Sequence, residues 1–135
     1  MTYGNHKSVD VYAISDRKQR ALKIEVKTSQ RDKFVTSISQ KCLAEDPHVP
    51  DFWVLFQIRP GENGSFDERF FILTHAEIRK AQMARNQIYS QKCFARHGKK
   101  PDSSTGVDGV RIADVLRYQD QWSKIIDRLG GPATD

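Results

Sequence analysis

Residues 9–28 read VDVYAISDRKQRALKIEVKT, and this stretch predicts the first two strands of a sheet. Its first part, 9–14, is rich in β-branched and apolar residues and stops at a polar turn, so it predicts a strand. In its second part, 21–28, apolar side chains alternate with charged ones, which is the period of a half-buried strand. The short polar connection between the two strands predicts a hairpin.

The remaining patterns alternate between helix and strand. A nearly continuous apolar run is typical of a strand covered on both faces, and clusters of Pro, Gly and Asn indicate loops. The resulting order predicts an α/β or α+β domain with a mixed β-sheet flanked by helices. The expected elements after the hairpin are a helix over 35–44, a strand over 52–58, a loop over 60–65, a strand over 69–73, a helix over 74–92, a loop over 96–109 and a helix over 112–129.

The sequence marks the start of the first long helix and the end of the second. Thr74 and Glu77 have the spacing of a capping box, which predicts a helix start. The last helix has a firm stop at Gly130, and its apolar stripe includes Tyr118 and Trp122, so we expect these rings to pack rather than to stack on bases. The apolar members expected for the first of the two helices are Ile78, Ala81, Met83 and Ile88.

Length and composition limit the possible classes of protein. With 135 residues, of which 38% are hydrophobic, the chain can bury a core as one domain, 1–135, without disulfides or a structural metal. No apolar run approaches the roughly 18 residues that a membrane span needs, and no apolar leader opens the chain. Cys42 and Cys93 have no CxxC partner, which favours reduced, structural thiols. These features predict a cytoplasmic protein without a membrane partner.

The net charge of +5 is unevenly distributed. Residues 16–33 hold seven basic and three acidic side chains, and residues 79–100 hold seven basic and no acidic ones. Between them, residues 45–68 hold six acidic side chains and one basic side chain. Each block can be an ordinary solvated face, but two basic blocks folded onto one side would suit phosphate, so nucleic acid is the leading class of partner.

Three charged residues of the hairpin could carry chemistry. Alternation places Glu25 and Lys27 on one face of their strand and turns Val26 toward the core, while the partner strand can bring Asp10 alongside. Two converging carboxylates repel each other unless a cation neutralises them, and oxygen ligands suit a hard ion such as Mg²⁺. A lysine beside the ion could hold a phosphate oxygen or orient an attacking water. The pattern therefore favours phosphodiester hydrolysis.

Asp10, followed after 14 residues by Glu25-Val26-Lys27, resembles the motif of the PD-(D/E)xK nuclease superfamily. The aromatic strand 52–58, the strand 70–73 that enters a helix, and the segment 118–122 are also similar to small bacterial members. The resemblance implies a restriction-endonuclease-like core and a DNA endonuclease that depends on Mg²⁺ or Mn²⁺. It implies metal ligation by Asp10, Glu25 and the Val26 carbonyl, with Lys27 as the catalytic lysine.

Two features depart from the superfamily pattern. Val9 stands in place of the proline that gives the motif its name. Many members also begin with a helix that supplies another acidic residue, whereas residues 1–9 contain no Asp or Glu. The expected domain therefore lacks the usual N-terminal helix: its metal site is incomplete, the chain is a fragment, or another subunit, such as the second copy in a homodimer, supplies the helix.

Simpler interpretations stay open for the same residues. Asp10 could be a strand-edge residue paired with a lysine, and Glu25 could belong to a solvent-facing ladder of opposite charges. Gln30 could contact substrate but needs no function at a strand end. The four histidines have no metal-binding spacing; His75, beside a helix cap, is interpreted as structural, and His97 could touch phosphate.

The leading hypothesis is thus a Mg²⁺-dependent DNA endonuclease whose basic blocks bind backbone phosphates without reading sequence. One alternative is a catalytically inactive module on the same fold that binds nucleic acid or a protein partner. Another is a regulatory protein that presents its acidic segment, 45–68, to a basic partner. The residues expected to contact DNA are Arg17, Lys18, Lys33, Lys99 and Lys100.

Overall fold

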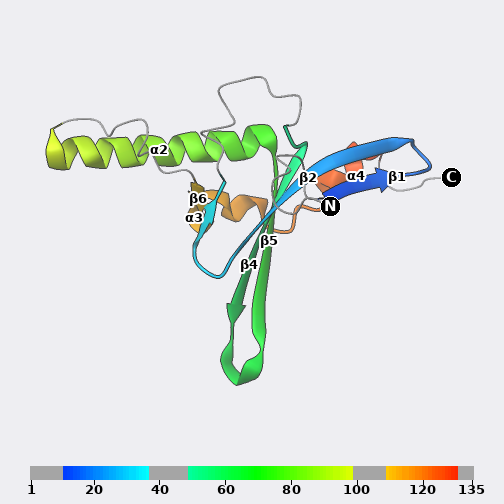
Figure 1. The fold of residues 1–135 in the computed structure, drawn as a ribbon, viewed down its shortest axis with the longest axis horizontal. Coiled ribbons are helices and arrows are strands. Elements are labelled where there is room, and N and C mark those ends of the chain that lie inside the picture. The colour runs from blue at the N-terminus through cyan, green and yellow to red at the C-terminus, as the bar shows by residue number, and fades with distance from the viewer. Residues whose placement is uncertain (1–10, 37–48, 99–108, 131–135) are drawn as a thin grey trace, which may run out of the picture.

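A mixed four-stranded sheet forms the centre of the protein, which is therefore an α+β fold (Figure 1). The structure is a computed structural model, and it describes residues 11–36, 49–98 and 109–130. The strand order is β1-β2-β4-β5, and the strands are β1 (Val11–Ser15), β2 (Arg20–Ser29), β4 (Phe52–Pro60) and β5 (Phe66–Thr74).

The predicted hairpin is confirmed, and it leads into a parallel strand pair. β1 and β2 are antiparallel, with Val11 opposite Ile24 and Ser15 opposite Arg20. β2 then runs parallel to β4, whose Trp53 is the Cα partner of Glu25. A crossover must join two parallel neighbours, so the chain leaves the sheet between β2 and β4.

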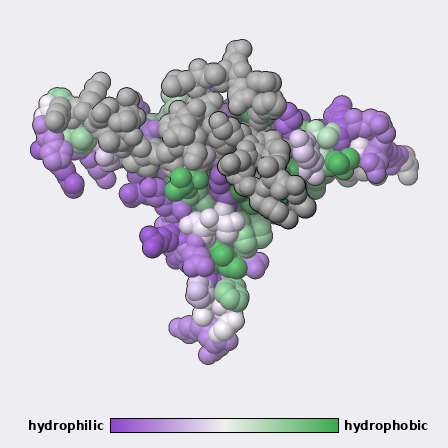
Figure 2. Space-filling view, viewed as in Figure 1, coloured by the Kyte–Doolittle hydropathy of each residue, from purple (hydrophilic) through white to green (hydrophobic). Residues whose placement is uncertain are grey.

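β4 and β5 form a long antiparallel hairpin that extends past the other two strands. Their register runs over nine pairs, from Phe52 opposite Thr74 to Pro60 opposite Phe66. In Figure 1 this hairpin points away from the rest of the molecule, and Figure 2 shows a largely hydrophilic tip. The tip contains the short 3₁₀ helix η1 (Glu62–Gly64), where the predicted loop lies.

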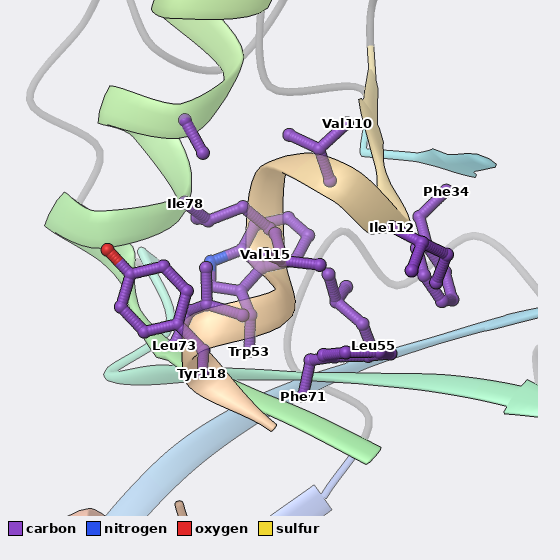
Figure 3. Close-up of a cluster of buried hydrophobic side chains, with 11 residues drawn as sticks. Phe34, Trp53, Leu55, Phe71, Leu73, Ile78, Val110, Ile112, Val115 and Tyr118 are labelled. Atoms are coloured by element: carbon purple, nitrogen blue, oxygen red, sulfur yellow. The ribbon is translucent and has the colours of Figure 1, made fainter. Parts of the chain in front are cut away.

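Each face of the sheet packs against its own apolar cluster. One face carries Leu22, Ile24 and Val54, which the short helix α4 (Ser123–Arg128) covers through Ile125. The opposite face carries a larger cluster, shown in Figure 3, to which helical segments and a second sheet contribute. Its members are Phe34, Trp53, Leu55, Phe71, Leu73, Ile78, Ala81, Val110, Ile112, Val115 and Tyr118.

A second, two-stranded sheet was not predicted. It pairs β3 (Lys33–Val35) with β6 (Gly109–Arg111) in antiparallel register, so that Phe34 lies opposite Val110 in the larger cluster. The two backbones approach closely at Gly109, where an added Cβ atom would lie 2.3 Å from the Phe34 carbonyl oxygen. Only glycine fits there without a shift of the backbone.

The long helix α2 (His75–His97) begins as predicted. The Thr74 hydroxyl accepts a hydrogen bond from the Glu77 N–H at 3.1 Å, and the Glu77 carboxylate accepts one from the Thr74 N–H at 2.9 Å. Our predicted end near Lys92 is wrong, because no Gly or Pro interrupts the helix before Gly98, which caps it in the left-handed conformation.

Three other boundaries also need correction. The helix expected over 35–44 is wrong at its start, since Val35 belongs to β3 and is 60% exposed; residues 37–44 lie outside the described residues. The loop expected over 96–109 is wrong at both ends, where α2 and β6 extend into it. Met83 and Ile88, expected among the apolar members of α2, are exposed.

The single helix expected over 112–129 is broken. It consists of α3 (Ile112–Val115), the 3₁₀ helix η3 (Leu116–Tyr118) and α4, separated by residues 119–122. Asp120 has a φ of 56°, and its N–H donates to the Phe70 carbonyl at 2.9 Å, so the chain turns onto β5 here. Tyr118 is buried as expected, but Trp122 is 40% exposed and packs on Phe70.

Among the described segments, no helix is both long enough and apolar enough to cross a membrane.

Candidate functional site

The two charged residues singled out on β2 lie together on one face of the sheet. Glu25 Oε1 is 3.3 Å from Lys27 Nζ, and their side chains are 10% and 29% exposed. They are two positions apart on a strand, so both project to the same side. Val26 lies on the opposite face and packs against the smaller apolar cluster, as predicted.

Buried apolar residues of β4 lie beside the charged pair. Trp53 is the Cα partner of Glu25, and Leu55 is the Cα partner of Lys27; both of these β4 side chains are fully buried. Removing a carboxylate from water is costly unless a cation or hydrogen-bond donors compensate for it. The Lys27 ammonium supplies part of this compensation, so the pair is a charged site at the edge of an apolar cluster rather than a solvated ladder.

The described residues do not by themselves form a metal centre. Within 11–36, 49–98 and 109–130, no group of three or more His, Cys, Asp or Glu side chains could hold a metal ion. Asp10, the other expected ligand, lies outside these residues. A hard cation such as Mg²⁺ prefers several oxygen ligands, and here one carboxylate, Glu25, is in place.

A fixed turn follows the strand that carries the charged pair. The Ser29 hydroxyl accepts a hydrogen bond from the Arg31 N–H at 3.0 Å, and the buried Gln57 donates to the Arg31 carbonyl at 2.9 Å. Gln57 also donates to Asp32, which forms an ion pair with Arg59. These contacts lock the exit of β2 and therefore help to fix the position of Lys27, two residues before Ser29.

A histidine lies on the same side of the sheet as the charged pair. The indole Nε1–H of Trp53 donates to Nδ1 of His75 at 3.1 Å, and the two rings stack with centroids 6.2 Å apart. Partial burial lowers the pKa of His75 below its ordinary value of 6.5, and the nearby Arg79 cation lowers it further. His75 is therefore neutral at pH 7, with its remaining proton on Nε2.

The structure does not gather the expected DNA-contacting residues into one patch. Arg17 and Lys18 lie in the turn of the β1–β2 hairpin, whereas Lys33 lies on β3 opposite Arg111. In Figure 1 these two places are on different sides of the molecule. Lys99 and Lys100 lie outside the described residues.

Sequence reasoning missed two features around the site. One is the contact of His75, which the sequence interprets as structural, with Trp53, a buried residue that neighbours Glu25 across the sheet. The anchoring role of Gln57 was also missed. A polar residue within an otherwise apolar strand was the available signal for Gln57, whereas no local pattern signals the contact of His75 with Trp53.

Comparison of the chain with protein-family models, with curated proteins and with solved structures gave no match in any of the three.

Proposed function

We propose that the protein is a metal-dependent DNA endonuclease with a restriction-endonuclease-like core. The observation that carries the proposal is the Glu25–Lys27 pair, which β2 holds on one face of a mixed sheet beside the parallel strand β4. A carboxylate and a lysine at this spacing can together serve a metal ion and a phosphate oxygen. The net charge of +5 suits a polyanionic substrate.

The proposal needs a second carboxylate, which Asp10 would provide. The described register places Val11 opposite Ile24, and the site requires this antiparallel pairing to continue by one residue toward Glu25. Asp10 and Glu25, with the Val26 carbonyl, would then hold Mg²⁺ or Mn²⁺. The ion would neutralise charge that develops on the phosphate oxygens.

Lys27 acts on the substrate in this proposal. Its ammonium binds a non-bridging oxygen of the target phosphate and orients the attacking water. The water oxygen forms a new bond to phosphorus as the bond to the leaving oxygen breaks. The proton of the attacking water passes to solvent, and the leaving oxygen takes up a proton from solvent. The locked turn at Ser29 and Gln57 holds β2, so Lys27 needs little rearrangement before reaction.

A second candidate is a catalytically inactive module that binds nucleic acid. The direct contact between Glu25 and Lys27 favours it, because the ammonium can neutralise the carboxylate without a metal ion. The two candidates predict different responses to divalent cations.

Thermal melting in the presence of Mg²⁺ or Mn²⁺ separates the two functions. A ligand that binds only the folded state raises Tm, so the nuclease proposal predicts a rise in wild type that is lost in Glu25→Ala. The control Glu68→Ala removes an exposed carboxylate from β5 and should keep the rise. No rise in wild type with either cation would contradict the metal site and favour the inactive module.

A further inference from the structure

Arg79 and Lys80 lie beside His75 along a hollow on the surface of α2. His75, Arg79, Lys80 and Met83 are among the residues that line it. Residues four apart are neighbours on a helix, so the Arg79 guanidinium lies close to the His75 ring, which agrees with its effect on the pKa of His75. Among the described residues, neither cation forms an ion pair with a carboxylate.

The nearest carboxylate on the helix is already engaged. Glu77 accepts two hydrogen bonds from Lys124 Nζ, at 2.9 and 3.0 Å, and one from the Thr74 N–H. Its charge is therefore balanced, and the hollow, whose lining includes Ala76, Met83 and Ala84, carries its positive charge on Arg79 and Lys80, beside the neutral N–H donor of His75. That combination suits a phosphate group, which accepts charge-assisted hydrogen bonds.

The hollow is connected to the candidate catalytic pair through one buried side chain. Trp53 holds His75 by a hydrogen bond and lies one strand spacing, about 4.8 Å, from Glu25 across the sheet. Because Nδ1 accepts this bond, Nε2–H is the donor left for a ligand. Trp53 thus fixes both the position and the tautomer of His75 relative to the pair on β2.

We propose that His75 and Arg79, assisted by Lys80, bind a further backbone phosphate of the nucleic-acid strand whose target phosphate Lys27 binds. This inference rests on the proposed function, since it assumes a nucleic-acid substrate. It makes His75 and Arg79 substrate-binding residues that set the path of the strand along α2.

The indole signals of the two tryptophans provide a direct test. The chain contains only Trp53 and Trp122, and Trp122 packs on Phe70, which borders the apolar cluster on the opposite face of the sheet. In ¹H–¹⁵N spectra recorded in EDTA, a short DNA oligonucleotide should shift the Trp53 Nε1–H signal and leave that of Trp122 in place. EDTA prevents cleavage, so the readout is independent of catalysis.

Substitutions refine this test. His75→Asn keeps an acceptor near the position of Nδ1 but removes the Nε2 donor, and Arg79→Gln removes the cation; each should weaken DNA binding several-fold. Arg79→Gln should also reduce the slope of log K against log salt by about 1. The control Arg117→Gln removes an exposed cation that contacts the Tyr118 ring, and it should leave the Trp53 shift in place.

Three results would overturn the inference. DNA could bind without moving the Trp53 signal, or Arg79→Gln could bind with unchanged affinity and salt slope. Inorganic phosphate at the same concentration of phosphate groups could also move the signal as far as the oligonucleotide, which would indicate a site for free phosphate. A Trp53 shift without any cleavage in Mg²⁺ would leave the inference standing and contradict only the nuclease chemistry.

Discussion

Arg85 and Asp114 join α2 to α3 through two hydrogen bonds, one of 3.0 Å from Nε to Oδ2 and one of 2.6 Å from a terminal guanidinium nitrogen to Oδ1. Asp114 also accepts the Arg111 N–H at 2.8 Å, which caps α3. We expect Asp114→Ala to lower the free energy of unfolding by about 2 kcal/mol, because it removes a bidentate pair and a cap. Urea denaturation measures this loss.

The exposed Asp127 of α4 gives a matched control, because Asp127→Ala should change stability by less than about 0.5 kcal/mol. A double-mutant cycle with Arg85→Met isolates the pair itself. Equal effects of Asp114→Ala and Asp127→Ala would show that the bidentate contact contributes no stability.

Acid should weaken this contact. Burial alone would raise the pKa of Asp114, but hydrogen bonds from Arg85 and the Arg111 N–H outweigh it and lower the pKa. The Asp114 carboxylate therefore becomes protonated at a higher pH in the unfolded chain than in the folded protein. Stability from Asp114 is present above its ordinary pKa of 3.8 and is lost as pH falls through the lower folded value.

His75 should add a pH dependence nearer neutrality. Burial and the Arg79 cation lower the pKa of His75. The His75 ring therefore becomes protonated near pH 6.5 in the unfolded chain, but only at a lower pH in the folded protein. The free energy of unfolding should therefore fall as pH drops below 6.5. Urea denaturation across this range should show a shallower slope for His75→Asn, and an identical slope in wild type and variant would contradict the assignment.

Gly109 is expected to be intolerant of substitution. An added methyl group would lie 2.3 Å from the Phe34 carbonyl oxygen, so Gly109→Ala must separate β3 from β6. We expect a loss of about 1–3 kcal/mol, as for overpacked sites. Gly98→Ala is the comparison, since its φ of 69° is strained but its surroundings are open, and about 1 kcal/mol is expected there. A smaller loss at Gly109 than at Gly98 would contradict the close approach.

The sequence predicted the elements whose signals are local and repeated. The alternation over 21–28 identified β2, because alternation is the pattern of a strand with one buried face. The apolar run over 52–58 identified β4, because a continuous apolar run is the pattern of a strand buried on both faces. The capping box at Thr74 identified the start of α2 because its hydrogen-bond donors and acceptors all lie within four residues of the sequence.

The missed elements depend on contacts distant in sequence. β3 and β6 have three residues each, too few for a periodic pattern, and they form by pairing across more than 70 residues. The apolar spacing over 112–129 did predict helix, but the bond from the Asp120 N–H to the Phe70 carbonyl redirects the chain. No local rule predicts a partner on β5.

In the candidate site, too, the sequence predicted the local arrangement and missed the contacts between distant residues. The position of Glu25 beside Lys27 followed from strand alternation, and the structure brings the two together. The contact between His75 and Trp53 joins residues 22 positions apart on different elements, so the sequence alone could not indicate it. The arrangement of the first basic block, 16–33, also depends on tertiary structure, which separates the β1–β2 turn from Lys33.

Cleavage of supercoiled plasmid, linear duplex and single-stranded DNA in Mg²⁺ or Mn²⁺ is the measurement that decides whether Glu25 and Lys27 form a nuclease centre. We expect wild type to cut at least one of these substrates, Glu25→Ala and Lys27→Ala to lose cutting while they still bind DNA, and the β5 controls Glu68→Ala and Arg69→Ala to cut as wild type does. Binding without cutting by wild type, or undiminished cutting by Lys27→Ala, would contradict the proposed nuclease centre.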